Sequence, residues 1–203
     1  YVAYAVMARQ LAGAAYVQRD ESIPAVRSYL FRKPAGQVTE QVRVLWSTQP
    51  TNIALGADGP LTVTDMMGVA RTVALVNGRV HLGLSESPLY VSGTVRRIEP
   101  ADTWAVAIAP EAAADEPLAA RVRVQPAHPL ATQALTVQVG EQTAGLSRLS
   151  GATASTALVE LAAASAPGER WTPYEIRHDQ QVLFYGATLT QVRTPLVLAE
   201  FPH

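Results

Sequence analysis

Apolar and polar residues follow two different periods along the chain. Over the first fifteen residues, apolar side chains recur at helical spacing, at Tyr4, Met7, Leu11 and Ala15. This spacing places them on one face of an α-helix. Gly13 fits the C-terminal end of that helix, because glycine readily takes a positive φ there. The sequence therefore predicts one N-terminal helix.

Beyond the helix the period shortens to two, which is the spacing of β-strands. Short alternating or apolar runs are separated by clusters of turn residues, a pattern typical of β-sandwiches. The runs of the first half are 26–33, 39–47, 61–64, 71–84 and 87–93. The runs of the second half are 103–109, 120–125, 133–139, 156–161, 172–178, 181–186 and 188–201. Within 71–84, Asn77-Gly78 predicts a tight β-hairpin.

A charged segment, residues 94–102, separates the two series of strands. It contains Arg96, Arg97 and Pro100, and we expect a domain boundary there. We therefore expect two domains, 1–98 with the helix and a first sandwich, and 99–203 with an immunoglobulin-like sandwich. The expected fold class is mainly β, with two consecutive antiparallel β-sandwiches and one N-terminal helix.

Composition narrows the classes of partner. Of 203 residues, 48% are hydrophobic and 16% charged, which is typical of a globular chain. The net charge of −1 offers no basic surface for nucleic acid or for an anionic membrane. The apolar N-terminus is too short, and too interrupted by Arg9 and Gln10, to span a bilayer. We expect neither nucleic acid nor a membrane as partner.

The stretch Asp65-Met66-Met67-Gly68 follows the alternating run 61–64 and permits two interpretations. A carboxylate beside two thioethers suggests a metal site, but mixed hard and soft ligands make an unfavourable cage. Alternatively, Asp65 accepts a hydrogen bond from a backbone N–H two residues on, and Gly68 takes a positive φ. We expect the second arrangement, a corner of the sheet, with the methionines filling gaps around it.

Other residues that carry chemistry are scattered. The histidines are His81, His128, His178 and His203, and none recurs at metal-ligand spacing. There is no cysteine, which excludes thiolate chemistry and leaves the cellular compartment open. A nucleophile elbow and phosphate-binding loops are missing from the sequence. We expect no cofactor and no metal.

Three motifs in a fixed order carry a resemblance. After the apolar helix come Leu45-Trp46-Ser47 at the end of a strand, the corner Val63 to Gly68, and Pro88-Leu89-Tyr90-Val91 in a later strand. This order resembles the segment that closes many retaining glycoside hydrolases. In those enzymes the helix is the last of the catalytic (β/α)8 barrel, and the following strands form an accessory β-sandwich. The second half resembles immunoglobulin-like modules appended to such enzymes.

The resemblance implies a non-catalytic accessory region that braces or orients a catalytic barrel for carbohydrate hydrolysis, in a secreted or periplasmic protein. Its partners would be that barrel and a polysaccharide. Retaining hydrolysis needs two carboxyl groups about 5 Å apart, whereas Glu99 and Glu116, each before proline, are typical of loops. We therefore expect no enzymatic activity from this chain alone. We also expect self-association through residues 1–11, because an apolar helix needs cover on several sides.

An alternative hypothesis is a free-standing carbohydrate-binding or cell-surface adhesion module. Such modules stack sugar rings on exposed aromatic side chains. Trp171, Tyr174 and Tyr185 lie near one another in the C-terminal part of the sequence and are the candidate carbohydrate-binding residues. The competing interpretation is that these rings fill the core.

Overall fold

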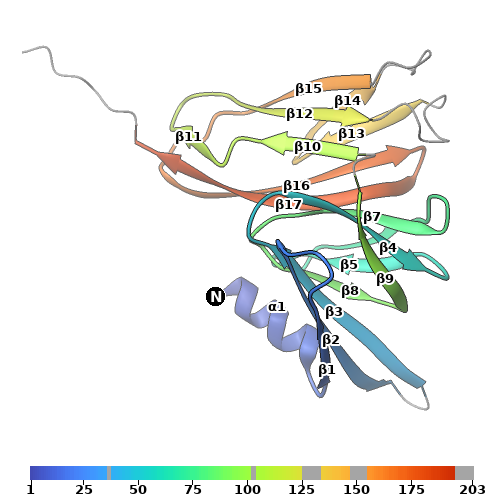
Figure 1. Cartoon of the computed structure of the whole chain (residues 1–203). Helices are drawn as coiled ribbons and strands as arrows, with labels where there is room; N and C mark the ends of the chain where they lie inside the picture. The colour runs from blue at the N-terminus through green and yellow to red at the C-terminus, as the bar shows by residue number, and fades with distance from the viewer. Residues whose placement is uncertain (36–37, 102–103, 125–133, 147–154, 195–203) are drawn as a thin grey trace, which may run out of the picture.

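The computed structural model describes residues 1–35, 38–101, 104–124, 134–146 and 155–194. These residues form one α-helix and seventeen β-strands (Figure 1). The elements of the first half are α1 (Val2–Leu11), β1 (Ala15–Asp20), β2 (Val26–Ala35), β3 (Val38–Ser47), β4 (Thr51–Ala57), β5 (Leu61–Thr64), β6 (Ala70–Val73), β7 (Arg79–Leu84), β8 (Leu89–Ser92) and β9 (Val95–Pro100). The elements of the second half are β10 (Trp104–Ile108), β11 (Glu111–Ala113), β12 (Leu118–Val124), β13 (Leu135–Val139), β14 (Gln142–Leu146), β15 (Ser155–Leu161), β16 (Gly168–His178) and β17 (Gln181–Arg193).

The first core lies between two layers of strands. One layer has the strand order β1-β2-β3-β8-β5-β6, and β9, β4 and β7 pair side by side in the other. Leu45, Val63 and Val91 of the first layer belong to the same buried cluster as Ile53 and Leu82 of the second. Because side chains alternate along a strand, the opposite face of β3 is left for α1.

The second core lies between a three-stranded sheet, β10-β12-β15, and the strands β17-β16-β13-β14. Strand β12 shows the alternation that its sequence predicts, since Val122 and Val124 are buried and Arg121 and Arg123 are exposed. Trp104, at the start of β10, is fully buried in this core.

Strand β17 joins the two cores. It pairs antiparallel with β16 and parallel with β6, β7 and β11. Val182 and Tyr185 belong to the first core, whereas Leu183 and Phe184 belong to the second. In Figure 1, β16 and β17 accordingly run between the upper and the lower strands.

The predicted fold class is confirmed: the chain is mainly β, with sandwich packing and one N-terminal helix. The helix ends at Leu11, where the N–H of Ala14 donates to the Leu11 carbonyl at 3.0 Å. Gly13 has a φ of 69°, as its predicted place at the helix end requires. The helix is therefore shorter than the first fifteen residues.

The hairpin prediction at Asn77-Gly78 is right about the turn and wrong about the strands. Both residues have positive φ, 52° and 71°, and Val76 and Arg79 pair across the turn. The flanking strands then separate, because β6 pairs with β5 while β7 pairs with β4.

The two runs expected at 181–186 and 188–201 are not separate strands, since Gln181–Arg193 forms the single strand β17. Residues 195–203 lie outside the described part.

The described part of the expected boundary, 94–102, is mostly a strand. Val95–Pro100 forms β9, which pairs with β4 from Ala57 to Ile53. Val95 and Ile98 point into the first core, whereas Arg96 and Arg97 face solvent. Beyond β9, the side-chain amide of Asn52 donates to the Trp104 carbonyl at 2.7 Å. The division into domains 1–98 and 99–203 stays a prediction.

We expect the native chain to resist trypsin at Arg96 and Arg97. A protease needs an extended, detached backbone, and β9 would have to leave β4 to supply one. Limited digestion followed by mass spectrometry of the fragments measures this. The control is the same digestion in urea, where both sites should be cut. Rapid cleavage at Arg96 or Arg97 under native conditions, with two stable halves left, would contradict this expectation and support a domain boundary at 94–102.

Candidate functional site

The Asp65 corner has the geometry that its sequence predicts. One carboxyl oxygen of Asp65 accepts hydrogen bonds from the N–H groups of Met67 and Val69, both at 2.9 Å. The Gly68 N–H donates to the Asp65 carbonyl at 3.0 Å, and Gly68 has a φ of 88°. The corner interpretation is therefore confirmed, including the bond from two residues on.

The second carboxyl oxygen of Asp65 has a partner that lies far away in sequence. The hydroxyl of Tyr185, on β17, donates to it at 2.9 Å. Asp65 is fully buried. Burial, together with this carboxyl group, raises the pKa of the Tyr185 phenol well above its ordinary value, so the hydroxyl stays protonated and can donate. The corner thus ties the first sandwich to the central strand.

Ion pairs surround the buried Glu175, which pairs with Tyr185 across β16 and β17. Glu175 of β16 is buried, and its carboxylate lies 3.1 Å from Nε of Arg71 and 2.7 Å from Nε of Arg177. Arg71 follows the Asp65 corner on β6, so this cluster also joins the two halves of the chain. Arg71 also donates a hydrogen bond to Glu175, and removing this partner would leave more of the buried charge uncompensated.

Tyr174 lies over two glycines. Gly83 of β7 and Gly186 of β17 are paired in register. A Cβ atom added to Gly186 would lie 2.5 Å from the Tyr174 ring, and one added to Gly83 would lie 2.5 Å from its hydroxyl oxygen. The ring of Tyr174 also stacks on Phe184, with centroids 6.1 Å apart. The two glycines therefore make room for an aromatic ring that locks three strands together.

The predicted aromatic platform is corrected by these positions. Tyr174 and Tyr185 expose only 6% and 1% of their surface, because one ring covers glycines and the other holds Asp65. Trp171, on β16, is partly exposed. The structure therefore does not bring the three rings together on one exposed face, and the interpretation as core residues holds for both tyrosines.

Exposed apolar side chains gather around α1. Inside, Val6 packs in a cluster with Val44 and Tyr90. A Cβ atom added to Gly68 would lie 3.1 Å from Val6, so the Asp65 corner lies against the helix. Among the described residues, the exposed large apolar side chains other than Leu158 form what we call the α1 patch: Tyr1, Val2, Tyr4 and Met7 at the helix, Tyr16 and Val17 on β1, and Met67 and Val69 at the corner.

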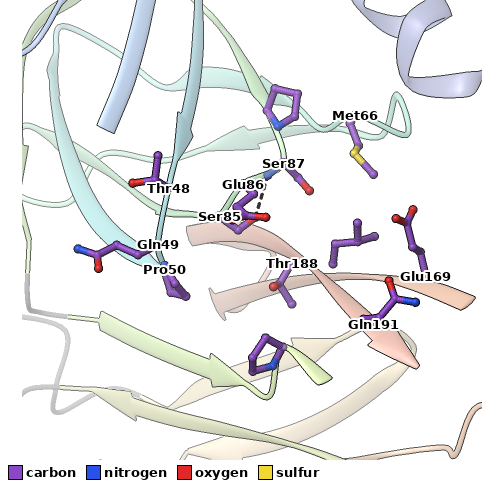
Figure 2. A pocket seen from close by; sticks show the side chains of 13 residues that line it. Thr48, Gln49, Pro50, Met66, Ser85, Glu86, Ser87, Glu169, Thr188 and Gln191 are labelled. Carbon is purple, nitrogen blue, oxygen red and sulfur yellow. Dashed lines mark hydrogen bonds between the residues drawn. The ribbon is translucent and has the colours of Figure 1, made fainter. Parts of the chain in front are cut away.

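A groove of about 630 Å³ opens where the two sandwiches meet. We call it the junction groove. Its walls come from the loops 48–50 and 85–88 of the first half, and from Pro110, Glu169 and the segment 188–191 of the second. In Figure 2, Thr48, Gln49 and Pro50 lie across the groove from Glu169 and Gln191, with Met66 at its rim.

The walls of the junction groove are held by hydrogen bonds. The hydroxyl of Ser85 donates to the carbonyl of Ala187 at 2.7 Å, and the N–H of Ser87 donates to the Ser85 hydroxyl (Figure 2). The N–H of Ser47 donates to the Ser85 carbonyl, and that of Gln191 to the Pro110 carbonyl, both at 2.8 Å. The groove is therefore preformed. The sequence analysis missed it; its only local signal is proline in each of the two loops.

No group of three or more metal-ligating side chains occurs among the described residues. His81 is buried, and burial followed by the neighbouring Arg79 lowers its pKa to about 4. Nδ1 of His178 lies 3.8 Å from a carboxylate oxygen of the exposed Asp179. His128 and His203 lie outside the described residues.

Among the helices of the described part, none is long and apolar enough to cross a membrane.

The two carboxylates expected in loops lie apart in the fold. Glu99 is in β9, not in a loop, and its carboxylate pairs with Arg79 at 2.9 Å and Arg97 at 3.2 Å. Glu116 is in the exposed turn after β11. The loop prediction is therefore wrong for Glu99 and right for Glu116.

Comparisons with known proteins show no family for this chain. No protein-family model matches the chain, and no curated protein matches it. Among solved structures, a transglutaminase of red sea bream is similar over 95% of this chain, with 9% sequence identity and a TM-score of 0.33. The chain spans 33% of that transglutaminase chain.

Proposed function

We propose that this chain is a non-catalytic accessory region of a glycoside hydrolase-like protein, and that it braces or orients a catalytic barrel. The α1 patch is the observation that supports the proposal. Soluble domains rarely gather this many exposed apolar side chains around one element unless another surface covers them. In the resembled enzymes, the helix that precedes the accessory sandwich belongs to the barrel, so the barrel is the expected occupant.

The geometry of the helix suits this role. Only one side of α1 is covered, through Val6, while Tyr4 exposes 69% and Met7 40% of its surface. The Asp65 corner contacts the helix at Gly68, next to Val6 and Arg9, and the neighbouring Met67 and Val69 are exposed. A docked barrel would therefore contact the helix and the sandwich together, which fixes an orientation and not only a tether.

The isolated chain is expected to self-associate through the α1 patch. Replacing Tyr4 and Met7 together by glutamine, which keeps helix propensity, should weaken association at least tenfold, or about 1.4 kcal/mol. Val6 is untouched, so the helix should stay docked. Trimming residues 1–11 should have at least the same effect while both sandwiches stay folded. Analytical ultracentrifugation over a range of concentrations measures this.

The matched control is Leu158→Gln, which changes an apolar side chain exposed on β15, outside the α1 patch. It should leave association unchanged. A chain that stays monomeric at high concentration would contradict the proposal. So would hydrolysis of aryl glycosides or polysaccharides by this chain alone, if the activity were lost on changing a single Asp or Glu. A free-standing module would then be the better hypothesis.

A further inference from the structure

The junction groove has the size and the rigidity of a ligand site. Its volume of about 630 Å³ is within the range of about 300–1,000 Å³ that small-molecule sites occupy. The hydrogen bond from Ser85 to Ala187 joins its two walls, and the bond from the Gln191 N–H to the Pro110 carbonyl holds the second wall together. A ligand would therefore not have to order these loops when it binds, which lowers the entropic cost of binding.

The polar lining of the groove indicates the chemical class of the ligand. Gln49, Thr188 and Gln191 present amides and a hydroxyl, and Glu86 and Glu169 present carboxylates. Together these groups both donate and accept hydrogen bonds. Neither carboxylate forms an ion pair with another described residue of the chain. They are therefore available to accept hydrogen bonds from hydroxyl groups.

The remaining lining narrows the class further. No arginine, lysine or histidine is among the described residues that line the groove, so an anionic ligand would meet two carboxylates without compensation. Pro50, Pro88 and Leu189 add rigid apolar surface between the polar groups. A neutral sugar offers matching groups, since its hydroxyl groups can bond to the polar side chains and the C–H groups on its ring faces can contact the apolar ones.

We propose that the junction groove binds a short, uncharged oligosaccharide. Carboxylates and amides hold the hydroxyl groups, and the prolines and Leu189 contact the ring faces. The proposal stands on the lining of the groove and does not depend on the docking of α1. It also assigns sugar binding to residues other than the aromatic ones that the sequence suggests.

Titration of the full chain with uncharged oligosaccharides tests this, using fragments of cellulose, xylan, mannan and chitin and ligand-observed NMR or calorimetry. At least one should bind with a dissociation constant in the millimolar range or below. The double variant Gln49→Ala/Glu86→Ala should weaken that binding at least tenfold. Both side chains are exposed, so the fold should be unaffected; circular dichroism and the melting temperature check this.

The matched control is Glu160→Ala, which removes an exposed carboxylate on β15, away from the groove. It should bind the oligosaccharide as the natural chain does. Binding that survives the groove variant, or no binding by any fragment, would overturn the proposal. A chain that binds oligolysine and no sugar would overturn it as well, because the carboxylates would then select a cation. The association of the Tyr4/Met7 variant is measured separately, so the two proposals can fail independently.

Discussion

Replacing Asp65 by alanine is expected to lower the free energy of unfolding by about 3–5 kcal/mol. The substitution removes the acceptor of three hydrogen bonds, from the N–H groups of Met67 and Val69 and from the Tyr185 hydroxyl. All three donors are left without this partner, and Asp65 itself is fully buried. Urea denaturation followed by circular dichroism measures the change.

Two further variants separate the local part of this effect from the long-range part. Tyr185→Phe removes only the hydroxyl and should cost about 1–2 kcal/mol. The two substitutions together should cost less than their sum, by about 0.5–3 kcal/mol, because they share one bond. The control Asp58→Ala breaks an exposed pair with Arg96 and should have little effect. Additive costs for Asp65 and Tyr185 would show that the hydrogen bond between them contributes nothing.

The Asp65 corner has a part that the local sequence predicts and a part that it does not. Its local half, a hydrogen bond two residues on and a positive φ at Gly68, follows from residue types at fixed spacing. Its other half, the bond from Tyr185, joins residues 120 positions apart. No local pattern encodes that pairing. The sequence therefore predicted the shape of the corner but not its role as a joint between the two halves.

The strands show the same limit. Alternation predicted β12 almost to its ends, since Val122 and Val124 face a core while Arg121 and Arg123 face water. In β9 the buried residues Val95 and Ile98 are three apart, and the pairing with β4 shifts register between Gly56 and Ala57. A bulge of this kind breaks the period of two, so the sequence pattern did not predict a strand at the expected boundary.

The candidate sites were less predictable than the fold. The exposed apolar helix follows from composition alone, since polar residues are few over residues 1–11. The junction groove does not, because its walls come from loops that only the topology brings together. The aromatic prediction failed for a related reason: whether a tyrosine faces solvent or a pair of glycines depends on its partners in the neighbouring strands.

Replacing Gly186 by alanine is expected to lower the free energy of unfolding by about 2–3 kcal/mol. Its φ is not in the left-handed region, so the backbone itself accepts alanine. The expected cost therefore comes from the contacts of the new methyl group alone. That methyl would lie 2.5–2.6 Å from the ring and hydroxyl of Tyr174. Tyr174 is stacked on Phe184 and buried in the second core, so it has little room to move.

The comparison that isolates this contact uses a second glycine and a second background. Gly145→Ala on β14 adds a methyl that meets nothing within 4 Å, so it should be neutral or slightly stabilising. In a Tyr174→Ala background, which is itself destabilised by about 3–5 kcal/mol, the cost of Gly186→Ala should disappear. If it persists there, the methyl group clashes with something other than the ring. Loss of the cost would show that the Tyr174 ring packs directly on Gly186, at the place where β7, β17 and β16 meet.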